Sequence, residues 1–251
     1  MSQHIVTIVQ ARMGSKRLPG KVLKPVLGKP LLEYLVERLR RVTKAGMLVV
    51  ATSVETEDDA IADFCEDAEV TVFRGSRDDV LDRYASAAKA TYADAVVRIC
   101  ADCPLIDPVV VDEAIQFYLD NDYDWVGNFL ERRYPRGYEV EVFSRKALDK
   151  AADEGLEADE REHVTPYLYR HPALFKLGSV VGKVDLGNQR WVVDTAEDFD
   201  LISHILSELY PRKPNYSTQD ILEVLQKNPD WMKLNAHIKQ RVVKGFPGDK
   251  K

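Results

Sequence analysis

Two sets of residues in this 251-residue chain have the types that phosphate chemistry requires. The first is a short basic segment between two apolar stretches, with the cations Arg12, Lys16, Arg17 and Lys21 and the glycines Gly14 and Gly20. Cationic side chains donate hydrogen bonds to phosphate oxygens, and glycine lets the backbone approach a phosphate closely. A solvated basic turn is the alternative interpretation. The position directly after the apolar run 5–9 favours phosphate binding.

The second set is a pair of aspartates, Asp102 and Asp194, which follow the apolar runs 95–100 and 191–193. Mg²⁺ is usually held by one or two carboxylates together with nucleotide phosphates. Each aspartate also has a structural interpretation, because Asp102 shortly precedes Pro104 in a turn and Asp194 can cap a following helix. Asp102 and Asp194 are therefore candidate metal ligands.

These residues must be positioned by the elements of the first half of the chain. The run 5–9 is rich in β-branched residues without clean alternation, which is typical of a strand buried on both faces. A helical pattern begins at Pro30. Strand and helix patterns then alternate over 47–52, 57–66, 70–73, 79–91, 95–100 and 108 to about 123. This order predicts an α/β fold with a mostly parallel sheet covered on both faces, and it places the basic segment and Asp102 on the same rim.

The alternation of strand and helix patterns changes in the second half of the chain. Residues 138–143 alternate in the manner of a half-exposed strand, Ser144 can cap a helix through Glu154, and 160–169 is expected to form another helix. We expect a small, partly antiparallel lobe at about 128–187, after which the chain returns to the sheet at 191–193. Beyond it, 216–229 has an amphipathic helical pattern, and 242–251 is expected to be a frayed tail.

The composition excludes several classes of protein. The net charge of −6 argues against a nucleic-acid-binding surface. No apolar run approaches the roughly 20 residues of a membrane span, and 5–9 is too short for a signal peptide, so we expect a soluble, cytoplasmic protein. The three cysteines do not form a complete zinc site and are expected to be reduced core thiols.

The basic segment has neither the P-loop spacing nor the dinucleotide-binding fingerprint. Instead, the stretch from Val9 to Lys21 resembles the signature of the sugar-acid cytidylyltransferases, and is most similar to the branch named for spore-coat polysaccharide synthesis. Segments 74–84, 101–106, 134–142, 160–167 and 194–198 resemble other parts of this family's pattern. Two positions depart from it, with Ala101 in place of the usual glycine and Ala196 in place of the usual proline.

The resemblance implies a Rossmann-like three-layer sandwich of the nucleotide-diphospho-sugar transferase type. It covers about 4–210, so we divide the chain into a domain at 1–210, which includes the lobe at 128–187, and a C-terminal helix and tail at 211–251. The lobe is expected to shape the acceptor pocket and to form a homodimer.

The resemblance, together with expected positions near the rim for Arg77 and Arg98, also assigns roles to residues. Catalysis is expected from Arg12, Lys21, Asp102 and Asp194, with Mg²⁺ on Asp102 and Asp194. The residues expected to contact the nucleotide are Gln10, Ala11, Arg12, Gly14, Ser15, Arg17, Lys21, Ser76, Arg77, Arg98 and Asp102. Those expected to contact the acceptor are Arg136, Glu139, Glu141 and His163, the last of which equally suits a structural role.

The predicted function is transfer of CMP from CTP to an acidic sugar, with release of pyrophosphate, in polysaccharide or glycoconjugate synthesis. Three alternatives remain open at this stage. They are a sugar-1-phosphate nucleotidylyltransferase that uses another nucleotide, a glycosyltransferase on a similar sheet, and a non-catalytic nucleotide-binding relative. The last is conceivable because Ala101 and Ala196 depart from the family pattern.

Overall fold

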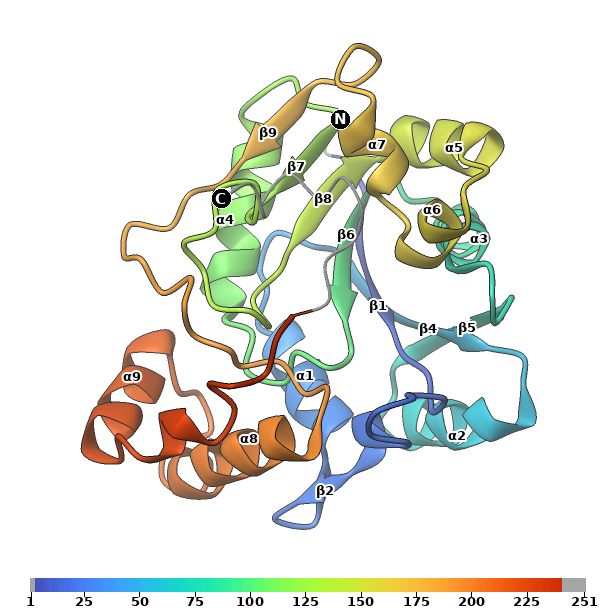
Figure 1. The fold of residues 1–251 in the computed structure, drawn as a ribbon. Helices are drawn as coiled ribbons and strands as arrows, with labels where there is room; N and C mark the ends of the chain where they lie inside the picture. The colour runs from blue at the N-terminus through green and yellow to red at the C-terminus, as the bar shows by residue number, and fades with distance from the viewer. Residues whose placement is uncertain (1–2, 241–251) are drawn as a thin grey trace.

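The computed structural model describes residues 3–240, which are built around one seven-stranded sheet (Figure 1). Its strand order is β5-β4-β1-β6-β8-β7-β9. The strands are β1 (Ile5–Gln10), β4 (Met47–Ser53), β5 (Thr71–Gly75), β6 (Ala95–Cys100), β7 (Trp125–Gly127), β8 (Glu141–Ser144) and β9 (Leu177–Ser179).

The sheet is mostly parallel, as predicted. β1 pairs in parallel with β4 on one side and β6 on the other, and β4 pairs in parallel with β5. Only β8 runs against its neighbours, β6 and β7, within the described sheet. The carboxyl ends of β1, β4 and β6 therefore meet at one rim, where the basic segment and Asp102 follow their strands.

Helices cover both faces of the sheet, which confirms the predicted α/β class. Side chains of β1 divide between the two layers, with Ile5 and Val9 in one core and Val6 and Ile8 in the other. The first core is shared with α1 (Leu31–Leu39), α2 (Asp59–Asp67), α4 (Pro108–Leu119), α8 (Ala196–Leu209) and α9 (Thr218–Lys227). The second is shared with α3 (Val80–Ala90), α5 (Arg145–Glu154) and α7 (Pro166–Arg170).

Short elements complete the described chain. A small hairpin, β2 (Pro25–Val26) with β3 (Lys29–Pro30), precedes α1. The remaining helical turns are η1 (Lys21–Leu23), η2 (Thr56–Asp58), α6 (Ala158–His163) and η3 (Trp231–Lys233).

The segment 128–187 contributes β8 and β9 to the same central sheet, and its helices α5 and α6 contact α3 (Figure 1). Ser144 caps α5 as predicted, because its Oγ accepts a hydrogen bond from the backbone N–H of Ala147 at 3.0 Å. The single helix expected at 160–169 is instead split into α6 and α7. The break lies at Val164, whose φ of 72° cannot continue a right-handed helix.

The prediction of a sheet strand at 191–193 was wrong. This stretch is extended and buried, but its backbone bonds go to two different segments. The N–H of Trp191 donates to the carbonyl of Arg136 at 2.7 Å, and the N–H of Val193 donates to the carbonyl of Asp102 at 2.9 Å. Two partners in different loops do not form a ladder, so the segment bridges them without joining the sheet.

The C-terminal pattern is confirmed over α9, which packs on α8. The tail expected at 242–251 lies outside the described residues. Among the helices of residues 3–240, none combines the length and the apolar character that crossing a membrane requires.

Candidate active site

The ammonium group of Lys21 lies between two carboxylates from distant parts of the chain. Its Nζ donates to Oδ2 of Asp102 at 2.6 Å, to Oδ1 of Asp194 at 2.9 Å and to the carbonyl of Val193 at 2.7 Å. Three donors thus meet three acceptors. Burial lowers the pKa of Lys21, but the two aspartates outweigh it and leave the pKa well above its ordinary value. Lys21 therefore remains cationic.

The chain direction at Lys21 depends on Gly20. Gly20 has a φ of 68° and precedes η1, where a side chain on a β-carbon would be strained. The left-handed turn at Gly20 comes directly before Lys21, whose side chain contacts Asp102 and Asp194. The glycine of the sequence motif therefore has a conformational role in aiming the lysine.

Asp102 and Asp194 are held together through their backbones as well as through Lys21. Asp102 lies in the turn after β6, in which the N–H of Cys103 donates to the carbonyl of Cys100 at 3.2 Å. The bond from the Val193 N–H to the Asp102 carbonyl, at 2.9 Å, joins this turn to the segment that carries Asp194. Asp102 and Asp194 thus lie next to each other.

Asp194 faces two further cations. Its Oδ2 lies 2.9 Å from a guanidinium nitrogen of Arg17 and 3.1 Å from one of Arg190. Burial raises the pKa of Asp194, but Lys21, Arg17 and Arg190 together hold it below its usual range. The carboxylate is therefore ionised at neutral pH.

The basic segment is anchored by Asp58, at the end of η2. The N–H of Met13 donates to Oδ1 of Asp58 at 2.6 Å, and the Oγ of Ser53 donates to its other oxygen. Asp58 is 1% exposed. Gly14 packs close by, since a β-carbon there would come within 2.9 Å of Oε1 of Glu57. Oε1 is the end of a flexible, exposed side chain, so Glu57 can move to make room for a larger residue at position 14.

Several predicted nucleotide contacts line this rim without joining the Lys21 cluster. The N–H of Ala11, just beyond the paired residues of β1, donates to the carbonyl of Ala51 in β4 at 3.1 Å. The Oγ of Ser15 accepts from Leu18 N–H at 3.4 Å, and the Oγ of Ser76 accepts from Asp79 N–H at 3.1 Å. Arg77 is exposed and pairs with Glu57 at 3.2 Å.

Arg12 is directed away from the two aspartates. A guanidinium nitrogen lies 3.7 Å from Oε1 of Glu162 on α6, and half of its side chain is exposed. The predicted catalytic set is thus divided. Lys21, Asp102 and Asp194 converge, whereas Arg12 extends from the same loop toward α6.

Arg98 and Glu141 form a buried pair where β6 meets β8. The register places them opposite each other, and Arg98 Nη1 donates to Oε1 of Glu141. Trp125 Nε1 donates to the second carboxylate oxygen at 2.9 Å, and Arg98 also donates to Oε1 of Gln10 at 3.1 Å. Glu141 is 2% exposed. Its carboxylate is thus engaged within the protein, which sequence alternation did not indicate.

The other predicted acceptor residues lie on two sides of the rim. Arg136 is bridged through its backbone to Arg190, next to the Asp194 segment. Glu139 accepts from Gly137 N–H at 2.6 Å and pairs with Arg132 at 2.8 Å. His163 ends α6, where burial lowers its pKa, and the positive charges of Arg98 and Arg12 lower it further.

Comparison with known proteins shows which family the chain belongs to. The family model described as cytidylyltransferase matches residues 6–227. The chain belongs to the cytidylyltransferase family. It is therefore a nucleotidyltransferase with a Rossmann-like core, as the sequence motifs predicted.

Three relatives illustrate the range of this cytidylyltransferase family. The spore coat polysaccharide biosynthesis protein SpsF of Bacillus subtilis is 35% identical over 235 residues, covering 90% of this chain and 95% of the relative. The 3-deoxy-manno-octulosonate cytidylyltransferase of Trichlorobacter lovleyi is 35% identical over 119 residues, covering 47% of this chain and 46% of the relative. The solved structure of a cytidylyltransferase from Leptospira borgpetersenii has 31% identity and a TM-score of 0.85, covering 97% of this chain and 99% of that chain.

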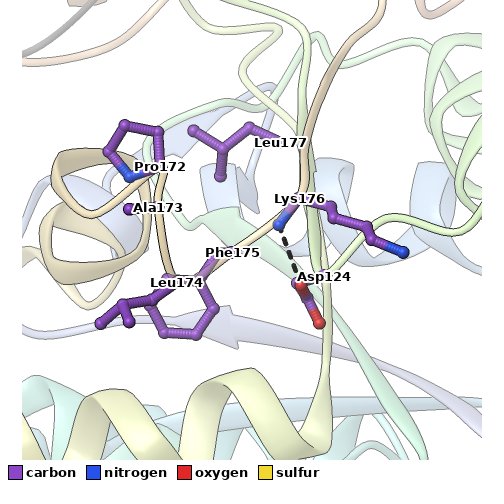
Figure 2. Close-up of a pocket in the computed structure, with 7 residues that line it drawn as sticks. All are labelled: Asp124, Pro172, Ala173, Leu174, Phe175, Lys176 and Leu177. Atoms are coloured by element: carbon purple, nitrogen blue, oxygen red, sulfur yellow. Dashed lines mark hydrogen bonds between the residues drawn. The ribbon is translucent and has the colours of Figure 1, made fainter.

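A cavity of about 470 Å³ lies elsewhere in this cytidylyltransferase (Figure 2). It is lined by Asp124 and residues 172–177, and the N–H of Lys176 donates to Oδ2 of Asp124 at 2.9 Å. These two residues precede β7 and β9, so the cavity lies at the amino ends of those strands. It contains none of the predicted site residues and is separate from the Lys21 rim.

Four residues of the site region were missed by sequence reasoning: Asp58, Arg190, Asp198 and Asn235. Asp198 alone had a usable signal, since a threonine followed three residues later by an acidic residue is a capping-box pattern. Thr195 and Asp198 do form that box at the start of α8. The other three residues act through contacts that no local pattern encodes.

Proposed function

We propose that this cytidylyltransferase transfers CMP from CTP to an acidic sugar and releases pyrophosphate. The observation that supports the proposal best is the convergence of Lys21, Asp102 and Asp194 beside a basic loop at the carboxyl ends of parallel strands. Ligands of open α/β sheets bind at this rim.

In the proposed reaction, an acceptor hydroxyl attacks the α-phosphorus of CTP in line. A new oxygen–phosphorus bond forms, the bond to the bridging oxygen of the β-phosphate breaks, pyrophosphate leaves with the electron pair, and the proton of the attacking hydroxyl is released to solvent. Arg17 and Arg12 hold the leaving phosphates, because guanidinium groups match phosphate geometry and both side chains retain exposed surface. Lys21 keeps the two aspartates in place and adds positive charge close to the α-phosphate.

The residues also suit Mg²⁺. Asp102 and Asp194 share Lys21 as a partner, so their carboxylates lie close together, and both remain partly exposed. Both oxygens of Asp194 face cations, whereas Oδ1 of Asp102 lies outside these ion pairs. Two carboxylates beside nucleotide phosphates are the usual protein contribution to a magnesium site. When bound, Mg²⁺ would neutralise phosphate charge and lower the pKa of the acceptor hydroxyl.

The acidic nature of the acceptor is supported by the charge at the other side of the rim. His163 lies within the electrostatic influence of Arg98 and Arg12. Arg98 is already paired with Glu141, so a sugar carboxylate placed there would meet chiefly the half-exposed guanidinium of Arg12, whose partner Glu162 lies 3.7 Å away and is itself exposed.

The test is product identification. The protein is incubated with Mg²⁺, each of the four nucleoside triphosphates in turn, and a mixture of 2-keto-3-deoxy sugar acids, and products are analysed by mass spectrometry together with pyrophosphate release. We expect a CMP–sugar-acid adduct with CTP alone. Pyrophosphate release only with another nucleotide and a sugar 1-phosphate would overturn the proposal, as would cleavage of a nucleotide-sugar without pyrophosphate.

The homodimer and the cytoplasmic location remain predictions from the sequence. Light scattering of the purified protein tests the first, and fractionation of the source cells tests the second.

A further inference from the structure

The chain continues past α9 and passes back beside the start of α8 (Figure 1). This C-terminal segment, residues 228–240, lies beyond the part of the chain that the family model matches. One side chain in it, Asn235, is 4% exposed. A buried amide side chain needs hydrogen-bond partners, and those of Asn235 lead toward the active site.

Asn235 contacts two residues of the site region. Its Nδ2 donates to the backbone carbonyl of Arg190 at 3.0 Å and to Oδ1 of Asp198 at 2.8 Å. From the same segment, the Oε1 of Gln240 accepts a hydrogen bond from Nη1 of Arg190. The C-terminal segment thus binds both members of the Arg190–Asp198 pair.

Arg190 and Asp198 in turn hold Asp194. Arg190 forms two bonds of 2.8 Å with the carboxylate of Asp198, and its Nη2 also contacts Oδ2 of Asp194 at 3.1 Å. Asp198 is fully buried and accepts from the backbone N–H of Asp194 at 3.0 Å and of Thr195 at 3.1 Å. Both the main chain and the carboxylate of Asp194 are therefore fixed by this pair.

We propose that the C-terminal segment is a positioning element of the active site, in which Asn235, with Gln240 beside it, orients Asp194 through Arg190 and Asp198. The inference rests on the proposed role of Asp194 in holding Mg²⁺ against the nucleotide phosphates. Asn235 and Gln240 act only through other residues. Their loss should therefore reduce metal binding and kcat while leaving the KM for the acceptor unchanged.

The test compares two matched variants. Asn235→Leu removes the donor while keeping the number and branching of the side-chain heavy atoms. Asn228→Leu is the control, because Asn228 lies in the same segment and donates from Nδ2 to the carbonyl of Val224 at 3.0 Å, outside the Arg190–Asp198 network. Two quantities are measured: kcat for CMP transfer, and the affinity for Mn²⁺ in the presence of a non-hydrolysable CTP analogue, by electron paramagnetic resonance.

We expect Asn235→Leu to lower kcat at least tenfold and to weaken Mn²⁺ binding at least fivefold. Asn228→Leu should change each by less than twofold, even if its urea-unfolding midpoint falls equally. Wild-type kcat and Mn²⁺ affinity in folded Asn235→Leu would overturn the proposal. Equal losses in the two variants would do the same, since they would reflect general destabilisation.

If Asn235→Leu does not fold, Gln240→Ala is tested in its place. We expect this variant to lose at least threefold in Mn²⁺ affinity, and an unchanged affinity would overturn the proposal. The Mn²⁺ measurement needs no turnover. If the wild-type protein transferred no CMP, the proposed function would fail, yet the effect of Asn235 on metal binding would still decide the positioning role.

Discussion

The ammonium nitrogen of Lys21 lies 2.6 Å from Oδ2 of Asp102, although the two residues are 81 positions apart in the chain. Their strands explain the closeness, since β1 and β6 are adjacent and parallel and each residue lies beyond the carboxyl end of its strand. The pair therefore links two loops of one rim. It also gives Lys21 a structural role in addition to the phosphate contact that the sequence indicated.

Lys21→Met should destabilise the protein as well as impair nucleotide binding. The variant leaves the carboxylates of Asp102 and Asp194 without their shared cation, and removing one partner of a buried ion pair typically costs about 3–5 kcal/mol. We expect a loss of about 3 kcal/mol, at the low end of that range, because the Asp102 side chain keeps 21% of its surface exposed. Urea unfolding measures it. Lys16→Met, at an exposed position of the same loop, is the control and should change stability by less than about 0.5 kcal/mol.

Asp102→Asn should keep the fold and lower kcat by at least about a hundredfold, the usual effect of removing one electrostatic stabiliser from an active site. An amide oxygen can still accept the hydrogen bond from Lys21, but the negative charge that would face Mg²⁺ is lost. Steady-state kinetics with CTP and the acceptor provide the measurement. Asp112→Asn, on α4 and bonded to Thr43, is a matched control expected to retain full turnover. An Asp102→Asn enzyme with wild-type kcat would remove Asp102 from the mechanism.

The placement of Lys21 and Asp102 was predictable because it follows from topology, whereas Asp194 follows an extended segment outside the sheet. Alternating strand and helix patterns imply parallel strands, and residues after such strands share one rim. Trp191–Val193 looked like a further strand for a related reason, since a buried apolar stretch of β-branched residues is typical of one. What sequence could not provide was the direction of its hydrogen bonds, which go to the loops at Arg136 and Asp102.

The Arg98–Glu141 pair was not predictable, because it depends on register. Period-two alternation in 138–143 suggested a half-exposed strand, and the family resemblance assigned Glu141 to the acceptor. The antiparallel pairing of β6 with β8 instead sets Glu141 directly opposite Arg98, and Trp125 covers the remaining carboxylate oxygen. Asp58 and Asn235 are comparable cases, since each is buried by a contact between segments far apart in the chain.

The pKa of His163 should be lower than the ordinary value of about 6.5 in the free protein and should rise when CTP binds. Burial disfavours the imidazolium form, and Arg98 and Arg12 repel it. A triphosphate held by Arg12 would offset part of that positive charge and make protonation easier. NMR titration of the His163 ring with and without CTP is the measurement, with His204, on α8 and stacked on Trp231, as internal control. A His163 pKa that does not respond to saturating CTP would place the nucleotide away from Arg12.

Ala196→Pro should stabilise the protein without changing its activity. Ala196 is the first residue of α8, where proline is favoured because its fixed φ suits the helix and its missing N–H would have no helical partner. The preceding Thr195 has φ −127° and ψ 173°, an extended conformation that a following proline tolerates. Restricting the unfolded chain should then raise the free energy of unfolding by about 0.4–1 kcal/mol.

Ser207→Pro, at an exposed interior position of the same helix, should instead cost about 3 kcal/mol through its lost hydrogen bond and steric clash. If Ala196→Pro lowered the unfolding midpoint, the start of α8 would need a backbone conformation at residues 195–196 that proline cannot adopt.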